Sequence, residues 1–259
     1  KLICVGNLKE TVEYINGKIK APYKTSYENY ENQIVEDFED VRGHEEVKEA
    51  IMTAVAGGHN LLMIGSPGTG KTMIAKRIPG ILPPMSPEEQ IETTAVYSYA
   101  DRLTDKEPVM IKRPFRHVSA GVTVKALIGG GRNPVPGEVS LANKGVLFID
   151  EMLELAPNVL EALREPIEER KVVISRNSGT IVFPADFLLV GAANPCRCGY
   201  LGDKVHECTC SQSEIIRYKN KLSGALADRI DICVEVHRTD YENLKGKKGL
   251  TSTRMKEIA

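Results

Sequence analysis

The sequence predicts an α/β fold in which a parallel sheet is covered by helices on both faces. Four short apolar runs predict buried strands, at residues 61–65, 145–150, 187–194 and 231–236. Stretches with helical periodicity separate these runs. Strands that are apolar on both faces are typical of a parallel sheet between two helical layers.

The composition fits one large globular domain or two small ones. The chain has 259 residues, 42% of them apolar, with 34 Lys and Arg against 35 Asp and Glu. A net charge of −1 argues against a uniformly basic protein that coats nucleic acid, but it is compatible with a local basic surface. No apolar run approaches the ~18–20 residues that span a bilayer, and the first residues lack the apolar core of a signal peptide. We therefore expect a cytoplasmic protein that does not enter the membrane.

The chain divides into three predicted parts. Residues 1–35 are polar and rich in Tyr, and we expect them to be the tail of a preceding domain and a linker. Residues 36–237 contain all four apolar runs and form the predicted core. We expect residues 238–259 to be the start of a helical lid, or a linker.

Residues 65–72, GSPGTGKT, match the phosphate-loop pattern G-x-x-x-x-G-K-[ST] between a predicted strand and a predicted helix. Its glycines allow backbone N–H groups to converge, and the start of the helix favours negative charge. We expect Lys71 to reach the β- and γ-phosphates and Thr72 to ligate Mg²⁺, so the predicted cofactors are ATP and Mg²⁺. The predicted phosphate-binding residues are Gly65, Ser66, Pro67, Gly68, Thr69, Gly70, Lys71 and Thr72.

Polar residues follow the next two strands, at the edge where α/β sheets bind ligands. We expect Asp150 to hold Mg²⁺ through water and Glu151 to polarise the attacking water. Two adjacent carboxylates alone are more typical of a helix cap. In a chain that also has a phosphate loop upstream, they indicate nucleotide hydrolysis. Asn194 is expected to contact the γ-phosphate or the water; the alternative is an asparagine in a proline turn.

Arg229 precedes the fourth strand within the segment LADRID. We expect it to be an arginine finger that reaches the γ-phosphate of a neighbouring subunit, which would make hydrolysis depend on assembly. The alternative is a salt bridge to Asp228 or Asp231.

This order of motifs resembles an AAA+ ATPase and, more closely, the magnesium-chelatase-like family of the ComM/YifB type. The resemblance covers about residues 36–237. It rests on RPFR (113–116), GGGRNPVPGEVSLANKGVLFIDE (129–151), LEALREPIEERKVVISR (160–176), NPCRCGY (194–200) and LSGALADRID (222–231).

The resemblance implies an AAA+ P-loop NTPase core with β-hairpin insertions, which assembles as a hexameric ring. Similar members are associated with DNA processing in natural transformation as branch-migration helicases, and more distant relatives drive Mg²⁺ insertion into porphyrin. We expect an ATPase that moves single-stranded or branched DNA; the alternative is a chelatase-type or protein-remodelling motor. Two departures are that residues 117–120 replace the family's Ala-Pro-His-His and that the lid is largely absent.

Residues 111–137 are rich in Gly and Pro and contain five basic residues but no Asp or Glu. In the pore of a ring, such residues would follow a phosphate backbone without reading its sequence. The alternatives are solvent-facing loops or salt bridges between subunits. The predicted DNA contacts are Lys112, Arg113, Arg116, Lys125 and, on a predicted hairpin at 171–183, Arg176.

Four of the six cysteines form two C-x-C pairs, Cys196 with Cys198 and Cys208 with Cys210. Four thiolates in two close pairs are typical of a structural, tetrahedral Zn²⁺ site. Because C-x-C is less usual than C-x₂-C, reduced thiols without a metal and a redox-sensitive disulfide remain alternatives.

Overall fold

The computed structural model describes residues 7–20, 36–104, 107–176, 179–222, 224–238 and 249–259. The chain separates into two compact units, Lys1–Ile34 and Val35–Ala259. The described part of the first unit holds helix α1 (Leu8–Ile15), which begins where the side chain of Asn7 accepts a hydrogen bond from the backbone N–H of Glu10. The second unit contains every predicted strand.

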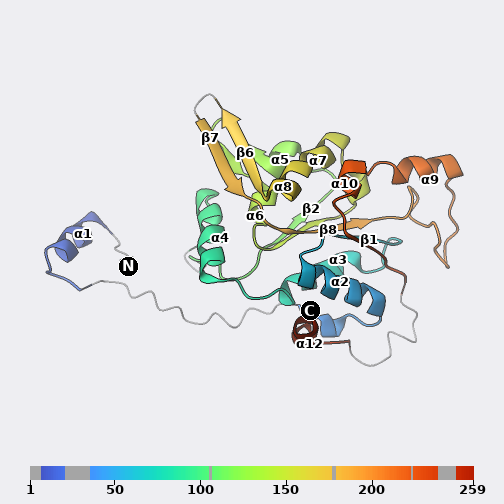
Figure 1. The fold of residues 1–259 in the computed structure, drawn as a ribbon, viewed down its shortest axis with the longest axis horizontal. Helices are drawn as coiled ribbons and strands as arrows, with labels where there is room; N and C mark the ends of the chain where they lie inside the picture. Colours follow the sequence, from blue (N-terminus) through green and yellow to red (C-terminus); the bar gives the residue numbers. More distant parts are fainter. Residues whose placement is uncertain (1–6, 21–35, 105–106, 177–178, 223, 239–248) are drawn as a thin grey trace. The chain divides into compact units, whose positions relative to one another are not determined.

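The second unit is built on a five-stranded sheet with the order β2-β5-β8-β1-β9, and all neighbouring strands are parallel (Figure 1). This confirms the predicted α/β fold, and its five strands include one, β2, that the apolar runs did not predict. The strands are β1 (Leu61–Ile64), β2 (Phe115–Val118), β5 (Val146–Ile149), β8 (Leu188–Ala193) and β9 (Ile232–Glu235).

Helices cover both faces of the sheet because successive side chains of each strand point to opposite sides. Leu61 and Met63 pack against α2 (Glu45–Gly57), α3 (Lys71–Arg77) and α12 (Ser252–Ile258). Leu62 and Ile64 face the second layer, which comprises α5 (Val124–Ile128), α6 (Glu138–Leu141), α7 (Pro157–Ala162) and α8 (Arg164–Glu169). Each fully buried Leu, Ile or Phe stabilises this arrangement by about 1.5–3 kcal/mol.

The predicted hairpin insertions are present on the second layer. Strands β6 (Lys171–Arg176) and β7 (Gly179–Pro184) form one antiparallel pair, and residues 177–178 of the predicted hairpin lie outside the described residues. A smaller pair joins β3 (Gly129–Gly130) to β4 (Val135–Pro136) inside the acid-free segment. Short 3-10 turns and three helices complete the described unit: η1 (Phe38–Asp40), η2 (Ile78–Gly80), η3 (Met152–Glu154), α4 (Pro87–Tyr99), α9 (Gln212–Lys219) and α10 (Gly224–Ala227).

Helix α12 packs on the core next to α2. The backbone N–H of Phe38 donates to the hydroxyl of Ser252 at 2.9 Å, and Met255 is fully buried. The assignment of residues 238–259 to a lid or linker stays a prediction, as do the boundaries of the preceding tail and core. None of the helices described in this chain has the length and hydropathy needed to cross a membrane.

Candidate nucleotide site

The phosphate loop connects β1 to α3 at the carboxyl edge of the sheet. Gly68 and Gly70 have φ angles of +77° and +89°, which glycine adopts without strain. The N–H of Gly65 donates to the carbonyl of Ala193 at 3.1 Å, and a Cβ on Gly65 would stand 2.2 Å from the carbonyl oxygen of Val236. The loop is therefore fixed between the ends of β8 and β9.

Lys71 is buried, and its ammonium group donates to the backbone carbonyls of Gly65 and Ser66. Burial lowers its pKa, while the nearby carboxylates of Asp150 and Glu151 raise it. A cation that is held mainly by its own loop is well prepared to exchange those carbonyls for phosphate oxygens, and this fits the predicted role.

The structure brings Thr72 and Asp150 together. The Thr72 hydroxyl donates to Asp150 Oδ2 at 2.9 Å, although the two residues lie on different elements. A hydroxyl beside a carboxylate supplies the hard oxygen ligands that Mg²⁺ prefers. Asp150 is fixed in place because its backbone N–H donates to the carbonyl of Val118.

Glu151 follows Asp150 with an exposed side chain and a left-handed backbone, with φ of +51°. For a residue other than glycine this conformation costs about 1–3 kcal/mol. Its backbone N–H donates to Asp150 Oδ1 at 3.0 Å. Asn194 follows the last residue of β8, so it lies at the same edge as the carboxylates and is half-buried.

His117 is a site residue that the sequence analysis treated only as a departure from the family. Its Nε2 lies 3.8 Å from Asp150 Oδ2, and its ring lies 5.1 Å from that of Phe148. The signal that could have found it is strand register, because β2 pairs with β5 so that His117 lies beside Phe148.

Arg229 lies at the opposite, amino edge of the sheet, three residues before β9 begins. Its Nη2 donates to Glu168 Oε1 at 2.6 Å, and the structure pairs it with this residue rather than with Asp228 or Asp231. Its side chain is 41% exposed. Within one chain, Arg229 is thus remote from the phosphate loop.

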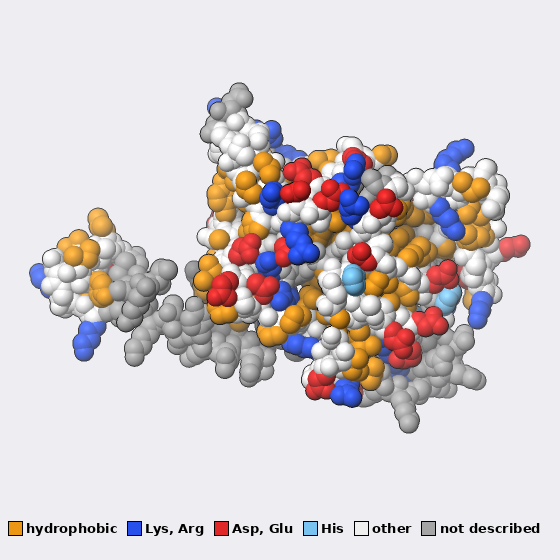
Figure 2. Space-filling model, in the orientation of Figure 1, with side chains coloured by type: hydrophobic (Ala, Val, Ile, Leu, Met, Phe, Trp, Pro, Cys, Tyr) orange, Lys and Arg blue, Asp and Glu red, His pale blue; other side chains and the backbone are white. Residues whose placement is uncertain are grey.

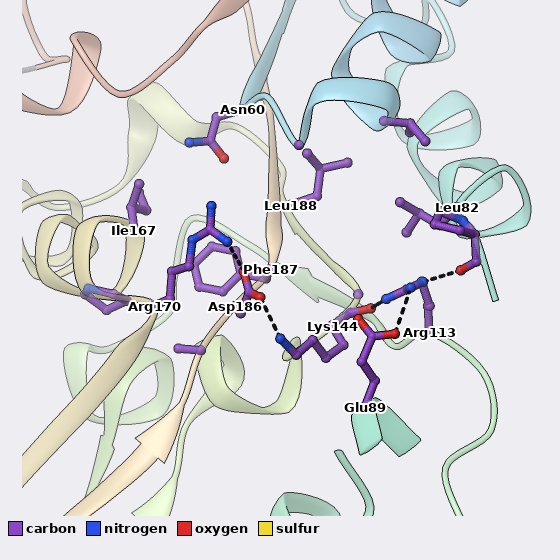
Figure 3. A pocket seen from close by; sticks show the side chains of 16 residues that line it. Asn60, Leu82, Glu89, Arg113, Lys144, Ile167, Arg170, Asp186, Phe187 and Leu188 are labelled. Carbon is purple, nitrogen blue, oxygen red and sulfur yellow. Dashed lines mark hydrogen bonds and ion pairs between the residues drawn. The ribbon is translucent and has the colours of Figure 1, made fainter. Parts of the chain in front are cut away.

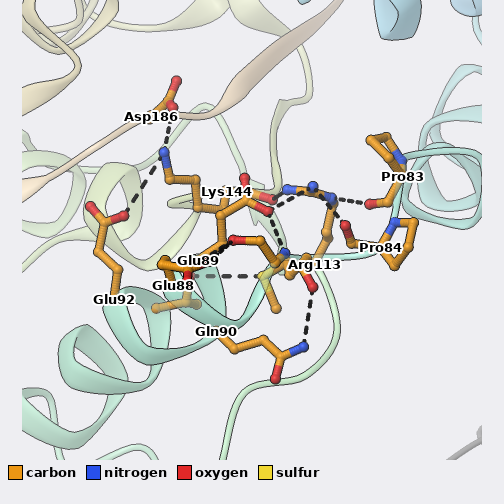
Figure 4. A network of polar contacts seen from close by, with 12 residues as sticks. Pro83, Pro84, Glu88, Glu89, Gln90, Glu92, Arg113, Lys144 and Asp186 are labelled. Carbon is orange, nitrogen blue, oxygen red and sulfur yellow. Dashed lines mark hydrogen bonds and ion pairs between the residues drawn. The ribbon is translucent and has the colours of Figure 1, made fainter.

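Arg113 is embedded in a network at the amino edge, as Figure 4 shows. Its guanidinium donates to the carbonyls of Pro83, Pro84 and Lys144 and to Glu89, and only 12% of its side chain is exposed. A guanidinium with this many protein acceptors is not available to a phosphate backbone.

Next to this network lies a cavity of about 230 Å³ whose walls include residues at the starts of β1, β5 and β8 (Figure 3). The charges of the cavity are paired: Asp186 accepts from Lys144 at 2.7 Å and contacts Arg170 at 3.2 Å.

Arg116, another predicted DNA contact, is also paired, because it binds Glu138 through two hydrogen bonds of 2.6 and 2.9 Å. Lys112 is half-buried.

Three other basic residues lie at the surface near Gly131, the residue after β3. Arg176 Nε lies 3.4 Å from the carbonyl oxygen of Gly131, and Lys125 Nζ lies 3.9 Å from the position that a Cβ on Gly131 would occupy. Arg132 is the next residue, and all three side chains are exposed. We call Lys125, Arg132 and Arg176 the basic cluster. On the face shown in Figure 2, by contrast, Lys and Arg alternate with Asp and Glu over most of the second unit.

The four cysteines of the two C-x-C pairs converge. Their sulfurs all lie within 4.8 Å of one another, and those of Cys196, Cys198 and Cys208 are 3.4–3.7 Å apart. Tetrahedral zinc with Zn–S bonds of about 2.3 Å separates its sulfurs by about 3.8 Å. A backbone N–H of Tyr200 lowers the pKa of the Cys198 thiol to about 6.

Comparisons with known proteins show which family the chain is similar to. A family model described as magnesium chelatase, subunit ChlI, matches residues 37–244. Competence protein ComM of Haemophilus influenzae is 42% identical over 258 residues, which cover 96% of this chain and 50% of that protein. The uncharacterized protein YifB of Salmonella typhimurium is 44% identical, over 77% of this chain and 39% of its own length.

More distant matches include the magnesium-chelatase 38 kDa subunit of Cereibacter sphaeroides, 28% identical over 61% of this chain and 52% of that protein. A solved complex between subunits BchI and BchD of magnesium chelatase is similar with a TM-score of 0.55 and 25% identity, over 80% of this chain and 63% of that one. The chain therefore spans about half the length, or less, of the curated relatives it matches.

Proposed function

Because the chain belongs to the magnesium chelatase family, and within it to the ComM and YifB type, we propose that it is an ATP-hydrolysing AAA+ motor that moves DNA. One observation carries the ATPase part of this proposal. The phosphate loop follows β1, and Asp150 and Glu151 follow β5, which is separated from β1 by β8 alone. The hydroxyl of Thr72 in the loop contacts Asp150 across this distance.

The proposed reaction assigns a role to each site residue at the carboxyl edge. The backbone N–H groups of the phosphate loop and the ammonium of Lys71 bind the phosphates, and Thr72 and Asp150 hold Mg²⁺. When bound, that ion neutralises charge that develops on the phosphate oxygens. Glu151 orients the attacking water and accepts its proton. The amide of Asn194 holds the water or the terminal phosphate.

Arg229 acts on a neighbouring subunit in this proposal. Its position at the amino edge supports this role, because it is remote from the phosphate loop of its own chain while its side chain remains partly exposed. The motor is therefore a homo-oligomer, and we propose the hexameric ring that the family resemblance implies. Arg229→Ala should retain nucleotide binding and lose hydrolysis; full turnover in a demonstrably monomeric sample would contradict the assignment.

The proposed DNA contact is the basic cluster. Arg132 lies between β3 and β4, Arg176 is the last residue of β6, and Lys125 lies on α5; all three side chains are exposed. Residues 111–137 contribute no Asp or Glu to this surface. We leave Arg113 and Arg116 out of the proposed contacts because their guanidinium groups are occupied by protein acceptors. The electrostatic contact predicts binding that weakens strongly with salt and ignores base sequence.

We also propose that the four cysteines bind a structural Zn²⁺. The sulfur separations support this assignment, and four protein ligands leave no open position for catalysis. Metal analysis of protein purified without added zinc tests it. About one equivalent per chain is expected, whereas less than about half an equivalent would contradict a four-cysteine site. A cytoplasmic location stays a prediction.

The decisive experiment measures ATP turnover of the assembled full-length protein with and without forked DNA. Stimulation that declines with rising salt is expected, and Lys125→Glu/Arg176→Glu should remove it without changing basal turnover. Turnover that is unchanged across DNA concentrations would overturn the DNA motor. It would favour the second candidate, a chelatase-type or protein-remodelling ATPase, for which the similarity to magnesium-chelatase subunits is the supporting observation.

A further inference from the structure

The loop that carries the four cysteines, residues 195–210, lies against the phosphate loop. We infer that metal binding by these cysteines holds this loop as a wall of the nucleotide site, so that metal occupancy sets the affinity for nucleotide. This inference rests on the proposed nucleotide site and adds a form of regulation to it.

The first contact between the two loops is made by Gly199, the residue after Cys198. Its backbone is buried and has φ of +87°. A Cβ at this position would stand 2.9 Å from Cδ of Pro67 and 3.9 Å from Cγ of Asn194. The N–H of Gly199 donates to the carbonyl of Cys196 at 3.0 Å, so the turn that carries Cys196 and Cys198 ends at the residue that touches the phosphate loop.

The second contact is made by Asp203, whose side chain is only 2% exposed. Its carboxylate accepts hydrogen bonds from the N–H groups of Val205 and His206 at 2.8 and 2.9 Å and from Arg238 Nε at 3.0 Å. Ser66 and Asp203 line the same pocket. The N–H of His206 above all, together with the side chain of Ser66, the N–H of Val205 and Arg238, holds the pKa of Asp203 well below its usual range.

Arg238 connects the same elements from the other side. It follows β9, and its Nη2 lies 3.4 Å from the carbonyl oxygen of Pro67. Pro67 is thus touched by Gly199 and by Arg238, and Ser66 by Asp203. Two consecutive residues of the phosphate loop take their positions from the cysteine loop and its partner.

The metal ligands bracket these contacts. Gly199 and Asp203 both lie between the pair Cys196–Cys198 and the pair Cys208–Cys210, so one ion on four sulfurs would close the segment that they occupy. Loss of the ion would release both ends of that segment, and the chain entropy gained would oppose the contacts with Ser66 and Pro67. Small displacements of groups that orient a phosphate have large effects on binding and turnover.

The test compares metal content with nucleotide affinity in the same samples. Zinc is removed from the wild-type chain with a chelator selective for zinc, and the Kd of a fluorescent ATP analogue is measured without Mg²⁺ before and after. We expect the affinity to fall by at least about tenfold and to return when zinc alone is added back. An unchanged Kd in metal-free, folded protein would overturn the inference.

Variants distinguish the effect of the contacts with the phosphate loop from the effect of metal binding. Gly199→Ala and Asp203→Asn should keep full zinc content yet weaken the affinity several-fold, because each disturbs a contact with the phosphate loop. Cys208→Ser/Cys210→Ser should lose both zinc and affinity. Cys233→Ser is the matched control, since Cys233 is exposed on β9 outside the loop, and it should change neither.

The outcomes distinguish this inference from the proposed function. Wild-type protein that contains zinc but binds no nucleotide would overturn the proposed nucleotide site. Nucleotide binding by protein that never contains zinc would overturn only the metal-dependent wall. Gly199→Ala and Asp203→Asn with wild-type affinity would show that the loop contacts do not shape the site.

Discussion

The two edges of the five-stranded sheet hold their charged residues in different ways. At the carboxyl edge, Lys71 is held mainly by carbonyls of its own loop, and Asp150 accepts hydrogen bonds from the Thr72 hydroxyl and the backbone N–H of Glu151. At the amino edge, Arg113 and Lys144 are both bound to carboxylates, at 3.1 and 2.7 Å. The carboxyl edge therefore retains polar groups that can exchange partners, whereas the charges of the amino edge already have them.

The partners of a basic residue indicate whether it stabilises this fold or binds a ligand. A lysine or arginine that is surrounded by fixed carboxylates contributes to stability, because removing it leaves those carboxylates buried and unpaired. Lys71, which donates to carbonyls of its own loop, and an exposed residue such as Lys125 remain available for a ligand. The following variants test whether the two edges do separate function from stability.

The largest expected effect is that of Glu151→Gln at the carboxyl edge. Removing the proposed general base should lower ATP turnover by about 10²–10⁴-fold, with little change in the Kd for nucleotide or in thermal stability. Single-turnover phosphate release measures the rate, and equal rates in variant and parent would assign Glu151 no catalytic role. Glu154→Gln, three residues beyond Glu151 in η3, is the control.

Lys71→Ala should abolish useful nucleotide binding, with a loss of affinity on the order of 100-fold, because a buried charge–phosphate contact disappears. Titration with a fluorescent ATP analogue measures it. Lys76→Ala is a matched control, since Lys76 lies on the same helix with an exposed side chain. Near-normal binding by the Lys71 variant would break the distinction between the edges.

Arg113→Ala should have the opposite profile. Loss of its hydrogen bonds to Glu89 and to backbone carbonyls should lower the free energy of unfolding by about 2–4 kcal/mol, while DNA affinity at a temperature where the variant is folded stays unchanged. Urea denaturation provides the first value and a salt-dependent DNA titration the second. A selective loss of DNA affinity would return Arg113 to the contact surface.

Arg132→Ala is expected to produce the smallest change. Because the side chain is exposed, stability should stay within about 0.5 kcal/mol of the parent. The slope of log affinity for DNA against log salt should fall by about one contact. A slope identical to that of the parent would remove this residue from the basic cluster.

The sequence was most informative where structure is determined locally. The four apolar runs predicted β1, β5, β8 and β9. The first three are buried on both faces, whereas β9, at the edge of the sheet, is only partly buried but keeps apolar residues. Strand β2 was not predicted, since its residues FRHV mix polar and apolar side chains at the edge of the sheet. The phosphate-loop pattern likewise identified Lys71 and Thr72 because its geometry depends on adjacent residues.

Contacts between distant segments could not be predicted in the same way. The partners of Arg113 come from α4 and from the segment before β5, so its burial depends on how the chain folds back. The pairing of Arg229 with Glu168 and the contact of Gly199 with Pro67 join residues that are 61 or more positions apart. Composition and local sequence patterns do not predict contacts between residues this far apart in the chain.

Arg229 and the phosphate loop lie at opposite edges of the sheet, so each subunit has two different ends for contact with its neighbours. In the proposed ring, the arginine of one copy completes the site of the next, and the second copy presents its own arginine to a third. Such an interface is heterologous, and it is satisfied when rotation closes a ring rather than when two copies face each other. Each site would then be governed by one neighbour only, so that successive hydrolysis events have a fixed sense around the circle.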